Sequence, residues 1–405
     1  MPNPYARIFR APGAKGFAAA GFVARMPMAM APIGIVAMLS QARGEFWLAG
    51  AVAATYGLAN ALIAPQISRL VDRVGQSRLL IPTTIIAVIA FALLMLSSSQ
   101  DWPVWTLFAT ALAAAVMPSF PAMIRARWTA LFRDRPELNM AFAFESAADE
   151  LVYIAGASIS VGLAVALFPE AGILASTTFL ALGGLAFIAQ RRTEPKPTGA
   201  TASSGKSAIR QRPVQIVTLA LIFVGATFAT TEVTAVAITE AWGDPGAASL
   251  VIGVYAVGSF VIGLIVGALN LKLALERQLL IALGVLAVTA IPLLFVGSVP
   301  VLAFAVFLSG IAISPTFITA FGLIERRVPA AMLTEGITWV MTGIGIGMAL
   351  GSFASGWVVD TYGPGNGFWV SVIAAAAAFL TILLGQRTLS GQDKRVPKGL
   401  AQPAE

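Results

Sequence analysis

The feature that most constrains this chain is a series of long apolar stretches, each about as long as a helix that crosses a bilayer. A membrane-spanning helix takes about 20 mostly apolar residues, and of the 405 residues here 58% are hydrophobic and 11% charged. Six stretches precede a polar segment and six follow it, at residues 14–39, 47–68, 79–99, 103–124, 143–168, 171–190, 213–238, 250–271, 278–298, 300–323, 335–359 and 367–386. The sequence therefore predicts an all-α polytopic membrane protein with 12 transmembrane helices, and its composition excludes a water-soluble enzyme.

The polar segment in the middle of the chain divides it into two halves. Residues 191–212, RRTEPKPTGATASSGKSAIRQR, are too hydrophilic to span a membrane and have the composition of a flexible linker. We therefore predict an N-terminal six-helix bundle over 1–190, a cytoplasmic linker over 191–212, a C-terminal six-helix bundle over 213–386 and a cytoplasmic tail over 387–405.

The distribution of Lys and Arg predicts the orientation. If both termini are cytoplasmic, all of the 26 basic residues except Arg25 and Arg43 fall in cytoplasmic segments, as the positive-inside rule requires. This placement accounts for the net charge of +7 without nucleic-acid binding. The first apolar stretch is too long for a removable signal peptide and should remain as the first helix. We expect the protein in the cell inner (cytoplasmic) membrane.

The two halves repeat each other weakly. Aligning the second span with the eighth pairs Tyr56 with Tyr255, and the fourth and tenth spans share Pro118 and Pro315. Glu145 at the start of the fifth span corresponds to Glu335 at the start of the eleventh. A repeat of this kind is typical of transporters built from duplicated bundles, and it predicts two pseudo-symmetric bundles.

The loop after the second span carries the most specific motif. Its sequence, SRLVDRVGQSRLL (68–80), resembles the loop signature of the major facilitator superfamily in Leu70, Asp72, Arg73, Gly75 and Arg78, whereas Ser68 stands where a Gly is usual and Gln76 and Ser77 replace basic residues. The resemblance covers essentially the whole chain and implies that Asp72, Arg73, Gly75 and Arg78 belong to a gate that clamps the two bundles on the cytoplasmic side. Gly75 would permit the tight turn, and Asp72 could pair with a helix N-terminus or an Arg.

Three further segments resemble bacterial efflux permeases of the same superfamily: RARW (125–128), AFESAADE (143–150) and ERRVPAAMLTEGITW (325–339). The fifth span has Ala157 where drug-proton antiporters commonly have a Pro. Export is therefore implied only loosely.

Ionisable residues inside spans are costly unless paired or hydrated, so each is a functional candidate. Arg25 lies near mid-depth of the first span, and Asp149 and Glu150 lie at a comparable depth in the fifth. Arg25 could pair with either acid or could attract an anionic substrate. Asp149 and Glu150 point about 100° apart on a helix, so one could face the cavity and carry a proton while the other pairs.

Glu145 lies one turn before Asp149, and we expect it near Arg125 and Arg127, as we expect Glu335 near Arg326 and Arg327. This pattern predicts that Arg127, Glu145 and Glu335 belong to the gate or to ion pairs at helix starts.

The seventh span carries a hydroxyl stripe of Thr227, Thr231 and Thr234, with Glu232 beside it in the outer third. The stripe could line the substrate cavity or could serve close helix packing, and Glu232 is a further proton-coupling candidate. Gly343, Gly347 and Gly351 form a packing face on the eleventh span. We expect Pro118, Pro121 and Pro315 to kink the fourth and tenth spans.

The sequence contains neither Cys nor His, and it contains no nucleotide-binding loop, so we expect no cofactor, no metal and no catalytic residues. The predicted function is alternating-access transport of a small organic solute, most simply proton-coupled efflux by a monomer in the lipid bilayer. Two alternatives remain open: proton-coupled uptake of a carboxylate-bearing solute held by Arg25, and a membrane sensor that has lost transport.

Overall fold

The computed structural model describes residues 4–43, 46–197, 207–244, 247–269, 271 and 273–390. These residues form helices η1 (Pro4–Arg10), α1 (Ala14–Arg25), α2 (Pro27–Arg43), α3 (Phe46–Val74), α4 (Gln76–Ser99), α5 (Val104–Ala114), α6 (Phe120–Phe132), α7 (Glu137–Ala166), α8 (Ala171–Ala189), η2 (Arg191–Thr193), η3 (Ala208–Arg210), α10 (Arg212–Ala241), α11 (Ala247–Ala268), α12 (Leu275–Ala290), η4 (Ile291–Phe295), α13 (Val299–Gly310), α14 (Ile313–Arg327), η5 (Ala330–Met332), α15 (Leu333–Tyr362), η6 (Pro364–Gly367) and α16 (Phe368–Leu389). The middle of the predicted linker (198–206) and most of the predicted tail (391–405) lie outside the described residues.

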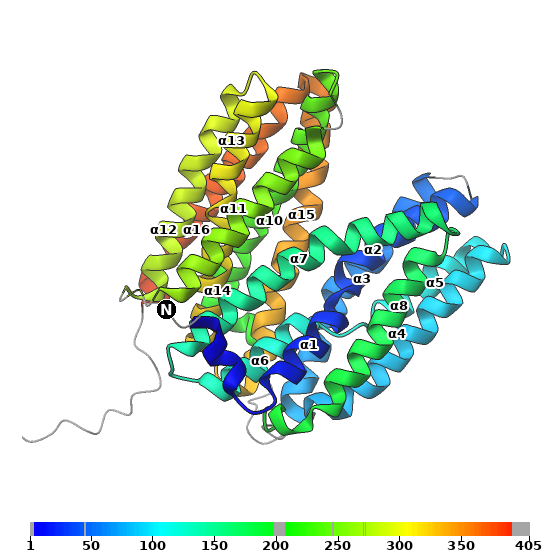
Figure 1. Ribbon diagram of the computed structural model, residues 1–405, viewed down its shortest axis with the longest axis vertical. Coiled ribbons are helices and arrows are strands. Elements are labelled where there is room, and N and C mark those ends of the chain that lie inside the picture. Colours follow the sequence, from blue (N-terminus) through cyan, green and yellow to red (C-terminus); the bar gives the residue numbers. More distant parts are fainter. Residues whose placement is uncertain are drawn as a thin grey trace, which may run out of the picture.

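The helices cross the molecule twelve times. Eleven helical segments of the described part are long and apolar enough to span a membrane when α1 with α2, α12 with η4, and α13 with α14 are each taken as one segment. The pair α5 and α6 makes the remaining crossing. Figure 1 shows α1 to α8 in one bundle and α10 to α16 in the other. The bundles diverge at one end and meet at the end where α6 and α14 lie. We call this the linker end, because η2 and η3, which flank the linker, lie there.

Three crossings are interrupted rather than only kinked. The first divides at Met26, immediately before Pro27, and the tenth divides between Gly310 and Ile313. In the fourth, α5 ends at Ala114 and α6 begins only at Phe120. The freed backbone needs partners inside the protein, and the Asn60 amide of α3 donates to the carbonyls of Ala115 (2.9 Å) and Met117 (3.0 Å).

The structure corrects the predicted position of Arg125 and Arg127. We expected both in a cytoplasmic segment after a span ending near residue 124, but both lie inside α6 and are fully buried. The chain continues as helix to Phe132, so the two guanidinium groups are carried into the bundle.

The predicted glycine face of α15 packs against α10. A Cβ on Gly343, Gly347 or Gly351 would meet the backbone carbonyl of Thr218, Ile222 or Ala226, respectively. The absence of side chains therefore sets how closely these two helices approach.

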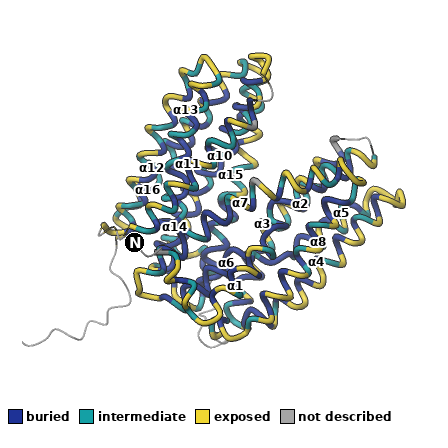
Figure 2. Tube along the Cα trace, viewed as in Figure 1, coloured by how far each residue is buried: buried dark blue, intermediate teal, exposed yellow. Residues whose placement is uncertain are grey.

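Exposed tryptophan side chains gather at one end of the molecule. The exposed tryptophans lie at or near the end away from the linker, at Trp102, Trp105, Trp242, Trp357 and Trp369. Figure 2 shows exposed residues along the outer faces of both bundles and buried residues inside them and where they meet. Tryptophan favours the membrane–water boundary, so this belt marks one edge of the apolar zone.

Candidate functional site

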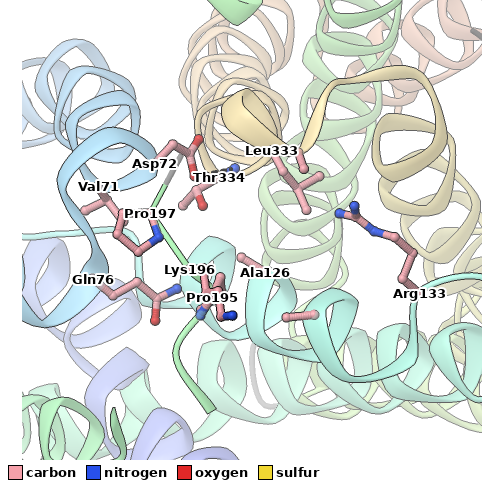
Figure 3. A pocket seen from close by; sticks show the side chains of 12 residues that line it. Val71, Asp72, Gln76, Ala126, Arg133, Pro195, Lys196, Pro197, Leu333 and Thr334 are labelled. Carbon is pink, nitrogen blue, oxygen red and sulfur yellow. Dashed lines mark hydrogen bonds between the residues drawn. The ribbon is translucent and has the colours of Figure 1, made fainter. Parts of the chain in front are cut away.

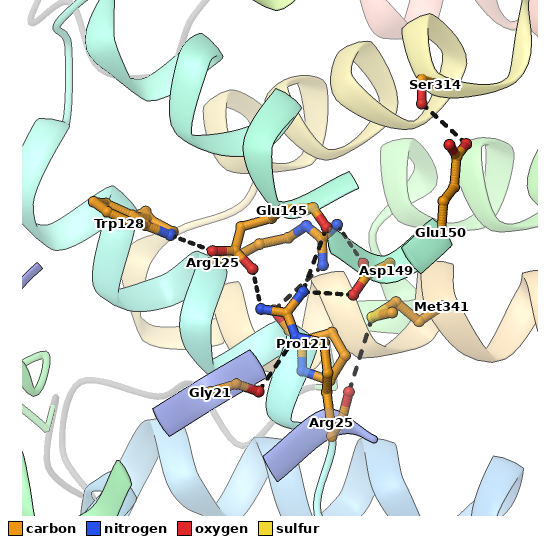
Figure 4. Close-up of polar contacts among 11 residues, drawn as sticks. Gly21, Arg25, Pro121, Arg125, Trp128, Glu145, Asp149, Glu150, Ser314 and Met341 are labelled. Carbon is orange, nitrogen blue, oxygen red and sulfur yellow. Dashed lines mark hydrogen bonds and ion pairs between the residues drawn. The ribbon is translucent and has the colours of Figure 1, made fainter. Parts of the chain in front are cut away.

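A cluster of four buried charges lies inside the N-terminal bundle, and Figure 4 shows its members converging from three helices. Arg25 of α1 pairs with Glu145 of α7, and its Nη1 lies 2.6 Å from Asp149 Oδ1. Arg125 of α6 approaches the other oxygen of Asp149 at 2.8 Å. The Trp128 indole donates to Glu145 at 2.7 Å. Two cations thus balance two carboxylates, and we call these four residues the charge cluster.

The positions of these side chains follow from helical spacing. Glu145 and Asp149 lie one turn apart and share a face of α7. Arg25 is the last residue of α1, where its Nε also donates to the Gly21 carbonyl at 3.3 Å. Cations stabilise helix C-termini, so the interruption at Met26 gives Arg25 a local partner as well as two carboxylates.

Glu150 points away from the charge cluster toward the other bundle. Its Oε1 accepts hydrogen bonds from Ser259 of α11 and from Ser314 of α14, the latter at 3.1 Å, as Figure 4 shows for Ser314. The two serine hydroxyls are 3.1 Å apart. Glu150 Oε2 is buried without a hydrogen-bond partner in the described structure. Glu150 is therefore a carboxylate of one bundle that is held by hydroxyls of the other.

A second contact between the bundles lies at the linker end. The Asp72 carboxylate accepts hydrogen bonds from the backbone N–H groups of Thr334 (3.3 Å) and Glu335 (3.0 Å) at the start of α15. One turn along, Thr338 donates to Ser68 of α3 at 2.7 Å. A carboxylate at a helix N-terminus is favoured by the helix dipole. We call these contacts of Ser68 and Asp72 with α15 the latch.

Glu335 adds a contact from the linker side. Its carboxylate accepts a hydrogen bond from Ser207, just before η3, and lies 3.9 Å from the guanidinium of Arg69 on α3. The Trp339 indole donates to it at 3.4 Å. Its predicted neighbour Arg327 lies instead 3.9 Å from Glu276.

The turn that follows Asp72, at the end of α3, has the conformation that the motif predicts. Gly75 has φ of +104°, a value that other residues rarely adopt, and it directly precedes α4. Beside this turn lies a pocket of about 260 Å³ whose wall includes Asp72, Arg133, Lys196 and Thr334, seen in Figure 3.

Within the described part of the chain, the other predicted gate residues form no hydrogen bond or ion pair with the opposite bundle. Arg127 donates to Gln76 and to the Gln190 carbonyl, both at 2.8 Å, and so ties α6 to α4 and to the end of α8. Arg78 is exposed and Arg73 is half-buried. Glu145 belongs to the charge cluster. Of the predicted gate, Asp72 and Glu335 contact the opposite bundle directly, with Gly75 shaping the turn.

Further contacts join the N-terminal and C-terminal halves of the chain. The Arg125 guanidinium lies 4.1 Å from the ring centre of Phe321 on α14, and Arg133 lies 3.7 Å from Glu325. The Tyr5 hydroxyl donates to the Leu264 carbonyl at 2.6 Å. Burial raises the pKa of Tyr5 to about 12, so this donor keeps its proton at physiological pH.

The hydroxyl stripe of α10 lies in helix packing and not on a cavity wall. Thr227, Thr231 and Thr234 are buried. Thr227 and Thr231 donate to backbone carbonyls one turn back, and Thr231 also lies 3.3 Å from Ser371 of α16. A Cβ on Gly367 would meet Thr234. Of the two interpretations that the sequence left open, cavity lining and close helix packing, this geometry agrees with helix packing.

Arg25, expected as a possible substrate-binding residue, is 1% exposed and paired with two carboxylates. Sequence reasoning missed Arg125 as its companion and missed Ser259 and Ser314 as partners of Glu150. One signal was available for Arg125, since apolar residues continue on both sides of it up to Phe132, which a loop would not show. Within the described residues, no group of three or more His, Cys, Asp or Glu side chains is placed to hold a metal ion.

The chain was compared with known proteins. No curated protein sequence matches it at a significant level. A solved structure of a bacterial homologue of the iron transporter ferroportin, in its outward-facing state, superimposes with a TM-score of 0.73 at 15% identity, covering 92% of this chain and 99% of that one. The human organic anion transporter MFSD10 gives a TM-score of 0.70 at 12% identity, with coverage of 92% and 99%.

The transporter FucP in its outward conformation gives a TM-score of 0.67 at 15% identity and covers 93% of this chain and 99% of its own. At such identities the likeness concerns the fold. The sequence model of the Major Facilitator Superfamily matches residues 17–236 and again 217–404, and the two matches together extend over both bundles. Twelve crossings in two bundles and this double match lead to one conclusion: the chain belongs to the major facilitator superfamily of membrane transporters.

Proposed function

We propose that this protein is a proton-coupled exporter that moves a small organic solute across the inner membrane by alternating access, with Glu150 as the proton-carrying residue. The two bundles, corresponding to residues 1–190 and 213–386, act as the moving units. Both termini and the linker lie in the cytoplasm, and the protein works as a monomer. The described arrangement, joined at the linker end, corresponds to the outward-facing state.

The observation that carries the proposal is the position of Glu150. Asp149 already has two cationic partners, Arg25 and Arg125, and the charge cluster as a whole is neutral. Glu150 forms no ion pair among the described residues, and its hydrogen bonds all reach the opposite bundle. An ionised carboxylate within a membrane span costs several kcal/mol unless it is paired or hydrated, and a bound proton removes that charge.

The coupling follows from where those hydrogen bonds end. When the bundles separate at the linker end, Ser259 and Ser314 leave Glu150, and water reaches the carboxylate from the other side of the membrane. Proton binding and release at Glu150 then depend on which side is open, which is the requirement for coupled exchange.

The alternative of carboxylate uptake through Arg25 is less well supported. Arg25 is buried, and two carboxylates already neutralise its charge. A third carboxylate would have to displace Glu145 or Asp149. A sensor without transport remains distinguishable by experiment, because it would bind a solute without exchanging it.

The test uses proteoliposomes and a panel of amphipathic organic compounds, with pH recorded while solute moves. The parent should show a solute-driven pH change whose sign indicates exchange of solute for protons. Glu150→Gln should lose this change and retain solute counterflow, because the neutral amide imitates the protonated acid. Glu240→Gln, an exposed acid at the outer end of α10, serves as the control and should behave as the parent.

Solute movement without a pH change in the parent would contradict proton coupling. A pH change that persists in Glu150→Gln would move the proton site elsewhere. Binding without counterflow in every variant would identify a sensor. The orientation is tested separately with reporter fusions at the linker, and an extracellular linker would overturn it.

A further inference from the structure

Two acids that form no ion pair within the described structure, Glu150 and Glu232, flank an aromatic surface made by Phe228 and Tyr255 beside the bundle interface. Glu150 of α7 bonds to Ser259 of α11, and Tyr255 lies one turn from Ser259 on the same helix. The Tyr255 ring packs against Phe228 of α10, with ring centres 5.3 Å apart. Glu232 lies one turn beyond Phe228 on α10. A continuous path of neighbouring side chains therefore leads from one carboxylate to the other.

The direction of the two helices gives the order of these groups in depth. Along α10 the step from Phe228 to Glu232 runs away from the linker end, whereas along α11 the step from Tyr255 to Ser259 runs toward it. Glu232 and Glu150 therefore lie about 12 Å apart along the helix axis, at 1.5 Å per residue over eight residues. Tyr255 lies between them, one turn from Ser259 on α11 and in ring contact with Phe228 of α10. Tyr153 lies one turn beyond Glu150 on α7.

The electrostatic balance of this surface is negative. Neither Glu150 nor Glu232 has an ion-pair partner among the residues that the structure describes, while the nearby charge cluster is self-neutralised. The hydroxyl of Tyr255 is also without a hydrogen-bond partner there, although the residue is only 2% exposed. The phenol oxygen and the two carboxylates therefore offer negative charge and oxygen atoms to a positively charged ligand.

We infer that Glu232, Tyr255, Phe228, Tyr153 and Glu150 form a binding site for an organic cation, with Glu232 as the ionic partner on the open side. Carboxylates attract the positive charge, and the faces of Tyr and Phe rings favour a cation whose charge is spread over an apolar body. Such a solute both neutralises the site and covers its aromatic surface. The inference names the class of solute for the transport proposed above. It rests on that proposal only for the claim that the bound solute is transported.

Equilibrium binding to the purified full-length protein tests the site without transport. The probes are tetraphenylphosphonium and tetraphenylborate, which share their shape and differ in the sign of their charge. We expect displaceable binding of the phosphonium and none of the borate. Glu232→Gln should weaken phosphonium binding at least tenfold, because the amide keeps the shape of the side chain and removes its charge.

Two variants provide matched controls. Glu232→Asp keeps the charge and should bind within about threefold of the parent, and Glu240→Gln, on the same helix two turns further on, should bind as the parent does. Displaceable binding of tetraphenylborate, or equal phosphonium binding by the parent and Glu232→Gln, would overturn the inference. The comparison of the two probes on the parent decides the question even where Glu232→Gln does not fold.

The outcomes also separate this inference from the proposed transport. A protein that binds the phosphonium through Glu232 but shows no proton exchange keeps the cation site and refutes proton coupling. Proton-coupled movement of a neutral solute, without phosphonium binding that depends on Glu232, would support proton coupling and refute the cation site.

Discussion

At the scale of single residues, two adjacent acids of α7 have different surroundings. Asp149 faces Arg25 and Arg125 inside its own bundle, whereas Glu150 faces Ser259 and Ser314 of the other. The sequence predicted that one of them could pair while the other faced the cavity, because neighbouring residues differ by about 100° around a helix. It did not decide which, since the rotation of α7 relative to α1 and α14 depends on packing between distant segments.

Removing one member of the charge cluster should destabilise the fold. Arg25→Leu leaves Glu145 and Asp149 short of a cation in a buried place, and the loss of one partner of a buried pair costs about 3–5 kcal/mol. We expect a clearly lower melting temperature in detergent, followed by tryptophan fluorescence. Arg78→Leu is the control, because Arg78 is exposed and such changes stay within about 0.5 kcal/mol. Equal melting temperatures of the two variants would show that the cluster is not stabilising.

At the scale of elements, α15 serves two purposes. Its first turn receives Asp72 of the opposite bundle, and its glycine face packs against α10 of its own. The glycine face was predictable from spacing alone, because the period of four residues marks one side of a helix. The interruption of the fourth crossing was not, because prolines only free backbone groups, and whether the helix kinks or breaks depends on a partner such as Asn60 of α3.

Two leucine substitutions on α15 test whether its glycine face must pack closely against α10. Gly347→Leu places a side chain against the Ile222 carbonyl of α10, so we expect α10 and α15 to be forced apart and the yield of folded protein to fall severalfold in size-exclusion chromatography. Gly345→Leu introduces the same side chain two residues earlier, where a Cβ meets nothing within 4 Å, and should fold like the parent. Normal yields of Gly347→Leu would contradict the close approach of these helices.

At the scale of the whole molecule, the two bundles meet at the linker end and diverge at the other. The twelve crossings were predictable, because hydropathy reports directly on the length of apolar segments. The relative placement of the bundles was not, since a transporter that alternates between two states has the same sequence and nearly the same helices in both. In the proposed cycle, contacts such as that between Ser68 and Thr338 form in one state and break in the other.

Cross-linking the latch should arrest the cycle. The chain has no native Cys, and the hydroxyl oxygens of Ser68 and Thr338 are 2.7 Å apart, so Ser68→Cys combined with Thr338→Cys can form one disulfide. Oxidation should abolish solute counterflow in proteoliposomes, and a reducing agent should restore it. Each single substitution should be insensitive to oxidant. Undiminished counterflow in the fully cross-linked protein would show that the linker end does not need to open.

The bond from Ser207 to Glu335 has a practical consequence for experiments that produce the halves as separate polypeptides. Ser207 comes before the first helix of the second half, yet its hydroxyl contacts the same turn of α15 that receives Asp72. A gene divided after this serine would place it at a free chain end on the first fragment. Dividing the gene before Ser207 keeps the serine on the polypeptide that carries Glu335, and reassembly of the two fragments then preserves the contact.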